Sequence, residues 1–289
     1  MSAPSCNNCK AILLAIIGFA AFSVSDACTK WLTDYYSVFQ IMGIKATFVM
    51  CMMIALSPFL GGLKKTLSTR KKRTHVARGL VNTALGVAVT ASFAHLPMAQ
   101  AYTLFFIAPL LTTILAIPVF KEQIHKQGWI AIAAGFAGVL IILRPGFGET
   151  NPWLFAALIA ALFIALLFLL AKALDERETL LSLPFFPVLS DLLLVLPFVW
   201  PILFHLTPDH IPLFALSSIM LIIGFVTVSF AFRIANSAIV GPFHYTQILW
   251  AVLFGYFIFG DLPDRWTIIG GALIIASGIY LIETERRKR

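Results

Sequence analysis

The chain consists mainly of long apolar runs that follow one another closely, and this pattern limits it to one class of fold. The runs cover residues 11–31, 38–59, 76–95, 98–120, 128–144, 152–172, 181–203, 212–233, 239–259 and 266–282. Each holds about twenty residues, the length of an α-helix that crosses a bilayer. Charged residues make up 12% of the chain and hydrophobic residues 60%, with a mean hydropathy of +0.93. The sequence therefore predicts an all-α integral membrane protein with ten transmembrane helices, because a membrane β-barrel would show short alternating segments instead.

Two stretches of the chain resemble each other at half its length. In each, an apolar run meets an acidic residue, Glu122 or Asp261, and a Gly-rich run follows. We predict that both acids cap turns that close equivalent helix hairpins. The resemblance indicates two repeats of five helices, residues 11–145 and 152–282. Since five is odd, the second repeat must enter the membrane from the opposite side, so the repeats are inverted.

The positive charges indicate how the chain is oriented. Of the 21 Lys and Arg residues, 17 lie on one side if the N-terminus is cytoplasmic, whereas Lys30, Arg144 and Arg265 lie at the opposite helix ends. Positively charged loops stay on the cytoplasmic side, so we expect both termini in the cytoplasm, in a bacterial inner membrane. The net charge of +8 and the basic loop 64–78 fit anchoring at the lipid bilayer. No nucleic-acid partner is expected, because no folded binding module accompanies these charges.

The cysteines give little sign of a metal site. Cys6 and Cys9 form one CxxC pair, but a structural zinc site needs four ligands, and no second pair follows. We therefore expect no metal and no cofactor. The first apolar run continues to Trp31 without a cleavage motif, which argues against a removed signal peptide.

Several charged residues fall inside the predicted spans, where each costs at least about 2.5 kcal/mol. Asp26 has two candidate partners: Lys30, four residues later on the same helix face, and Lys45, at a comparable depth in the next span. Asp191 has no cation near it in sequence. We hypothesise that Lys45 and Asp191 face one central cavity from opposite repeats, suited to a zwitterionic ligand or a coupling proton. The alternatives are pairing alone for Asp26 and, for Asp191, a neutral carboxyl bonded to Ser190 or Ser217.

Aromatic and polar residues complete the candidate binding site. His244 lies one turn inside the ninth span beside Pro242, which favours a local break of the helix. Trp250 lies well inside the same span and is either a stacking wall for a planar ligand or an ordinary packing residue. The predicted binding residues are Asp26, Lys45, Tyr102, Asp191, His244, Tyr245, Gln247 and Trp250.

Four motifs together resemble a known family. They are DACTK in the first span, Arg78-Gly79 opening the third, PFHYTQ in the ninth and FGDLPD before the tenth. With the repeat, they are similar to the EamA-domain branch of the drug/metabolite transporter superfamily, in particular to the subgroup with S-adenosylmethionine uptake transporters. The resemblance implies a ten-helix carrier with a central cavity between inverted halves, working by alternating access. The chain departs from the subgroup at Asp261, where Glu is usual, and at Lys45, where Arg is frequent.

These patterns predict a secondary transporter that moves a small organic metabolite across the cytoplasmic membrane. The aromatic and mixed-charge residues suit S-adenosylmethionine or another planar zwitterion or cation. Export of amino acids, drugs or vitamins such as riboflavin is the alternative, and the coupling ion, the exchanged substrate and the oligomeric state are left open. A membrane-embedded enzyme is the rival class, but the chain lacks an HExxH or GxSxG motif, and a channel would need a filter-like loop.

Overall fold

A computed structural model describes residues 6–59, 62–69, 71–121, 126–144, 151–172, 181–199, 206–235 and 240–286. All regular secondary structure within these ranges is helical. The α-helices are α1 (Cys6–Leu32), α2 (Val38–Leu56), α3 (Leu63–Leu67), α4 (Lys72–His95), α5 (Met98–Phe105), α6 (Ala108–Phe120), α7 (Lys126–Leu143), α8 (Trp153–Lys172), α9 (Ser182–Val199), α10 (Ile211–Ile234), α12 (Gln247–Phe259) and α13 (Arg265–Arg286). Three 3-10 segments join them, η1 (Ser57–Phe59), η3 (Pro208–His210) and η4 (Gly241–Thr246).

Each predicted apolar run contains a described helix, several helices extend beyond their runs, and the short helix α3 lies between two runs. Seven helical stretches are long and apolar enough to cross a membrane. Three further apolar stretches are shorter: Ser182–Val195, Phe243–Phe259 and Arg265–Leu281. The prediction of an all-helical membrane protein is confirmed, whereas ten spans of full length is more than the described residues provide.

Two predicted spans are interrupted. The run 98–120 breaks between α5 and α6, where Phe106 and Ile107 separate the two helices. Pro109 explains this break, because it has no N–H to donate to the carbonyl four residues earlier and its ring crowds the preceding turn. The run 239–259 divides into η4 and α12, so the break expected near the start of this span is present. Both interruptions are therefore linked to a proline in the sequence.

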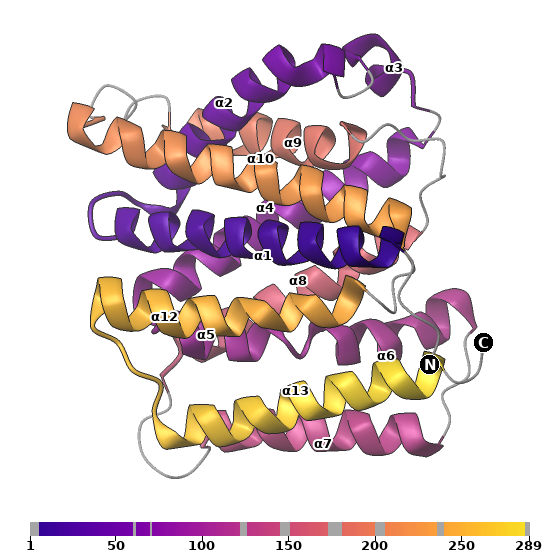
Figure 1. The fold of residues 1–289 in the computed structure, drawn as a ribbon. Helices are drawn as coiled ribbons and strands as arrows, with labels where there is room; N and C mark the ends of the chain where they lie inside the picture. The colour runs from indigo at the N-terminus through magenta and orange to yellow at the C-terminus, as the bar shows by residue number, and fades with distance from the viewer. Residues whose placement is uncertain are drawn as a thin grey trace.

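The helices pack so that residues from the first half of the chain contact residues from the second (Figure 1). α1 lies along α10, α8 lies along α4, α2 packs on α9 and α7 packs on α13. In the view of Figure 1, the α7–α13 pair forms the lower edge and α2 with α3 the upper edge. α1 begins, and α13 ends, on the side of the bundle that also carries α3. The centre of the molecule is consequently an interface between the two halves.

The α7–α13 pair is held by glycine contacts. A Cβ atom on Gly138 would lie 2.7 Å from the carbonyl oxygen of Gly270, and one on Gly270 would lie 2.6 Å from the carbonyl oxygen of Gly138. No side chain fits between backbones at this distance, so both positions require glycine. Small residues allow such close approach of membrane helices, where dispersion contacts rather than hydrophobic burial hold them together.

The turn before α13 is closed by backbone and side-chain caps. Gly260 adopts a φ of +70°, which glycine tolerates best, and its N–H donates to the carbonyl of Tyr256 at 3.1 Å. The Oδ1 atom of Asp264 accepts from the backbone N–H of Thr267 at 2.9 Å, so Asp264 caps the start of α13. The helix-start role predicted for Asp261 therefore falls to its neighbour three residues on, which stands at the N-cap position. Glu122, the other predicted cap, lies outside the described residues.

Candidate binding cavity

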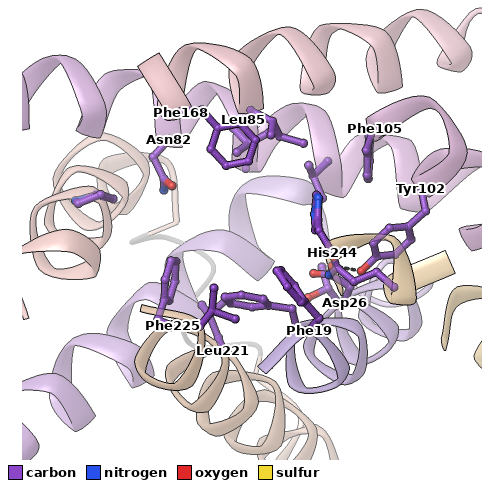
Figure 2. A pocket seen from close by; sticks show the side chains of 18 of the residues that line it. Phe19, Asp26, Asn82, Leu85, Tyr102, Phe105, Phe168, Leu221, Phe225 and His244 are labelled. Atoms are coloured by element: carbon purple, nitrogen blue, oxygen red, sulfur yellow. Dashed lines mark hydrogen bonds between the residues drawn. The ribbon is translucent and has the colours of Figure 1, made fainter. Parts of the chain in front are cut away.

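A cavity of about 1000 Å³ lies at the interface between the two halves. Residues from α1, α2, α4, α5, α6 and α8 to α10 line it, together with η4, Gln247 at the start of α12 and Leu281 of α13. This volume is at the upper end of the range for sites that bind small molecules. Figure 2 shows Phe168 and Leu85 on one side of the cavity and Leu221 and Phe225 on another. The walls are thus largely aromatic and aliphatic, and the polar side chains are few.

The first polar cluster contains Asp26, Tyr102 and Lys45, and we call it the Asp26 pole. The Tyr102 hydroxyl donates to Oδ2 of Asp26 at 2.5 Å. The Lys45 ammonium donates to the hydroxyl oxygens of Ser25 and Thr29, both at 2.9 Å. No ion pair within 4.0 Å joins Lys45 to Asp26 in the described part of the chain. Asp26 therefore takes its hydrogen bond from a tyrosine of another helix, while Lys45 is held by hydroxyls.

The second polar cluster contains Asp191, Asn82 and Thr83, and we call it the Asp191 pole. The side-chain amide of Asn82 donates to Oδ2 of Asp191 at 3.0 Å, and the Thr83 hydroxyl donates to Oδ1 at 2.6 Å. These bonds join α4 of the first half to α9 of the second. The approach is possible because Gly79 presents no side chain: a Cβ there would lie 2.6 Å from the Ser190 Cβ.

Sequence reasoning missed Asn82 and Thr83. The donors proposed for Asp191 were Ser190 and Ser217, but Ser217 instead donates to the carbonyl of Ser25 at 3.0 Å. The available signal was an Asn-Thr pair inside the apolar run 76–95, where adjacent polar side chains need partners. Their partner is distant in sequence, so spacing along the chain could not identify it.

The predicted residues on η4 and α12 fall into two groups. His244 and Gln247 line the cavity, and the His244 ring lies 5.1 Å from that of Phe19 and 5.3 Å from that of Phe106, centroid to centroid. Tyr245 is buried outside the cavity lining, with its hydroxyl against Gly278 of α13. Trp250 is also absent from the lining and stacks on Phe254 at 6.0 Å. Of the predicted binding residues on this segment, Tyr245 and Trp250 thus lie outside the lining and pack against other helix residues.

Lys30 joins three segments at the end of the bundle where α1 finishes. Its ammonium donates to the carbonyl oxygens of Phe93 at 3.1 Å and Leu96 at 2.8 Å, and lies 3.8 Å from Oδ2 of Asp261. We call this set of contacts the Lys30 tie. Lys30, one of the two candidate partners of Asp26, therefore pairs elsewhere, because its ammonium extends toward the helix end, where backbone carbonyls and an acid from the other half are available.

Known proteins resemble this chain over nearly its whole length. The EamA-like transporter family matches it twice, over residues 9–144 and 151–284. An S-adenosylmethionine uptake transporter of Rickettsia prowazekii (strain Madrid E) is 26% identical, over 94% of this chain and 92% of the relative. A riboflavin transporter of Rhizobium johnstonii is 27% identical, over 96% of this chain and 92% of the relative. One solved crystal structure, 17% identical, superposes with a TM-score of 0.65 over 96% of this chain and 99% of its own, which shows a shared fold.

Proposed function

The chain belongs to the EamA-like transporter family, and we propose that it is a secondary transporter that carries a small organic cation or zwitterion by alternating access. It is a membrane transporter by family, and the names of its relatives indicate a transporter rather than an enzyme. The observation that carries the finer proposal is the cavity of about 1000 Å³ between the two halves, with aromatic walls and both signs of charge. A site shared between halves can be exposed to either side by rocking one half against the other.

The helix pairings support an inverted repeat of residues 11–145 and 152–282. In this repeat, each helix of the first half has one equivalent in the second: α8 for α1, α9 for α2, α10 for α4, α12 for α5 with α6, and α13 for α7. Exchanging the halves then turns the α1–α10 pair into the α8–α4 pair. It also turns the α4–α9 pair into the α10–α2 pair, and both members of each exchange are packed together. The α2–α9 and α7–α13 pairs map onto themselves, as pairs on a two-fold axis must.

The positions of the chain ends support the cytoplasmic orientation. α1 begins and α13 ends on the same side of the bundle, which an even number of spans requires (Figure 1). α3, with Lys64 and Lys65, lies on that side too. Basic segments favour the cytoplasmic face, so we propose that both termini lie in the cytoplasm.

We propose that six lining residues contact the cargo or a coupling proton: Asp26, Lys45, Tyr102, Asp191, His244 and Gln247. S-adenosylmethionine is the first candidate cargo, because relatives over nearly the whole chain bear that name and because it combines a planar base with positive charge and a zwitterionic group. Riboflavin is the second, because another relative bears its name and its flat rings would suit the aromatic walls. The same cavity could serve uptake or export.

The test is flux into liposomes that contain the purified protein. We expect saturable uptake of radiolabelled S-adenosylmethionine in exchange for unlabelled S-adenosylmethionine inside the liposomes. The labelled compound should be recovered chemically unchanged. The Lys45→Met variant is the matched control for a protein that folds but lacks one cavity charge. Flux no greater than in empty liposomes, for both named compounds, would reject this cargo assignment, and chemical conversion of the cargo would favour an enzyme.

A further inference from the structure

The Asp191 pole offers mainly hydrogen-bond acceptors to the cavity. A carboxylate has about four lone-pair positions, and Asn82 and Thr83 use one on each oxygen of Asp191. The carboxylate can only accept, so the bond from Asn82 fixes the amide with its nitrogen toward Asp191. The amide oxygen and the second N–H of Asn82 then remain, and Asn82 itself lines the cavity, whereas Thr83 is buried outside the lining. This pole therefore matches a cationic or N–H-donating group.

The Asp26 pole differs because it retains one donor and one acceptor. The ammonium of Lys45 has three N–H groups and uses two on Ser25 and Thr29, which leaves one. The carboxylate of Asp26 accepts from Tyr102 through Oδ2, which leaves Oδ1. A free cationic donor beside a free anionic acceptor matches a group with both properties, such as an α-amino acid zwitterion.

The lining residues also leave the cavity with an uneven charge. When all three are ionised, Asp26 and Asp191 carry two negative charges and Lys45 carries one positive charge, while the described residues of the lining include no Arg and no further Lys. Arg78 lies one turn before Asn82 on α4 but is not part of the lining. With His244 uncharged, the lining carries a net charge of −1. A buried charge without a partner is costly, so a bound ligand of charge +1 is favoured over a neutral one.

Building on the proposed function, we infer that the cargo is a net monocation with a zwitterionic group at the Asp26 pole and its uncompensated cationic part drawn to the Asp191 pole, where Asp191 determines the preference for a cation and Asn82 contributes a further acceptor. Figure 2 shows Asn82 on one side of the cavity and Asp26 with Tyr102 on the other. The aromatic side chains between them would hold a planar middle part. Riboflavin, which has no cationic group, fits this arrangement less well than S-adenosylmethionine.

The experiment compares two probes that differ by one methyl group and one charge. S-adenosylmethionine carries a sulfonium and a net charge of +1, whereas S-adenosylhomocysteine is its neutral thioether. Binding to the purified full-length protein is measured by calorimetry, with riboflavin as a third probe. We expect the cation to bind about 10- to 100-fold more tightly than the thioether, the range typical of one charge-assisted interaction.

Variants of the Asp191 pole test whether the preference for the cation comes from the charge of Asp191. Asp191→Asn should reduce the ratio of the two affinities toward one, with the unliganded melting temperature serving as a check on folding. The double variant Asn82→Asp, Asp191→Asn exchanges amide and carboxylate between α4 and α9 and keeps the cavity charge. It should restore the preference for the cation. Asn82→Ala should keep the charge preference but weaken binding of the cation by several-fold, because one acceptor is lost.

Equal affinity for both probes in the wild type would overturn the inference, and so would a charge preference that Asp191→Asn leaves unchanged. Transport of the neutral thioether or riboflavin at the same rate as the cation would also overturn it but leave the transporter proposal standing. Charge-selective binding without any flux would support the inference and overturn the transporter proposal. Binding of none of the three probes at millimolar concentration would reject the inference together with the cargo assignment.

Discussion

The α7–α13 pair and the α2–α9 pair each join equivalent helices of the two halves, yet they are built differently. In the first pair, Gly138 and Gly270 bring one backbone against the other. In the second, side chains of Met50 and Met53 meet Leu181 and Phe185 in a cluster that fills the space between the helices. Backbone atoms cannot turn aside, whereas methionine side chains can adopt several rotamers of similar energy.

This difference separates a fixed part of the molecule from an adaptable one. The α7–α13 pair contributes only Leu281 to the cavity lining. The α2–α9 pair contributes Lys45 and Asp191, one charge from each half. A carrier that moves one half against the other needs a support with a single packing and an interface with several. We expect the first pair to serve as the support and the second to change during transport.

The largest expected effect is at the support. Gly138→Val would place Cβ 2.7 Å from the carbonyl oxygen of Gly270, and no side-chain movement relieves a contact with backbone. We expect a cost of about 3 kcal/mol or more and little folded protein on size-exclusion chromatography. Gly86→Ala on α4 is the matched control, because its Cβ would meet only the terminal methyl of Met42, 2.6 Å away. Equal loss of folding in both variants would remove the distinction between the two kinds of packing.

The second effect concerns the charge that α2 contributes. Lys45→Met keeps the length of the side chain but removes the bonds to Ser25 and Thr29 and the only cavity-lining ammonium. We expect at least about a 10-fold loss of uptake with nearly normal folded yield, since a charge-assisted bond contributes about 1.5–3 kcal/mol. Uptake in liposomes and melting temperature are measured on the same preparation. Normal uptake in Lys45→Met would contradict a cargo-binding role for α2.

A smaller effect is expected at the start of α13. Asp264→Ala removes the cap on the Thr267 N–H and should destabilise the protein by about 1 kcal/mol. Asp261→Ala removes a partly exposed ion pair at 3.8 Å and should cost less, about 0–1 kcal/mol. Thermal unfolding of the two variants side by side measures the order. If Asp261→Ala instead left folding normal and abolished transport, a direct role in the transport cycle would replace the structural one.

The smallest effect is expected at Trp250, which lies in the same run as His244 but outside the lining. Trp250→Leu should change the affinity for cargo by less than about twofold, because it alters only packing against Phe254. His244→Leu is the comparison, since it alters a lining residue of the same run. A larger loss of binding in Trp250→Leu than in His244→Leu would show that stacking at Trp250 matters for the cargo.

The positions of the helices could be predicted from the sequence more accurately than the contacts between them. Apolar runs located the seven helical stretches that are long enough to cross a membrane and the three shorter ones, because a helix in lipid needs an apolar surface along its length. The break after Phe105 was missed although Pro109 marks it, because a continuous apolar run obscured the proline. The break at η4 was found because polar residues accompany Pro242.

The polar contacts of the site were harder to predict, because each joins segments far apart in the chain. Asp26 was correctly selected from the cost of a buried charge, but its donor, Tyr102, comes from another helix. Spacing of four residues suggested Lys30 as its partner, and the fold places that ammonium on Asp261 instead. Local periodicity identifies which residues need partners, whereas only the packing of helices decides which partners they obtain.

The Lys30 tie connects one end of the bundle to the Asp26 pole through a short series of contacts. Lys30 donates to the carbonyl of Phe93, the Phe93 ring lies 5.9 Å from the Tyr102 ring, and Tyr102 donates to Asp26. A ligand that binds Oδ1 of Asp26 and shifts the Tyr102 ring would also change the packing of Phe93 beside the tie. Suppose that a bound ligand changes the stability of the tie by some factor. Thermodynamic reciprocity then requires that breaking the tie change the affinity of the cavity for that ligand by the same factor. Whether the Lys30 tie holds this end of the molecule closed would thus depend on whether the cavity is filled.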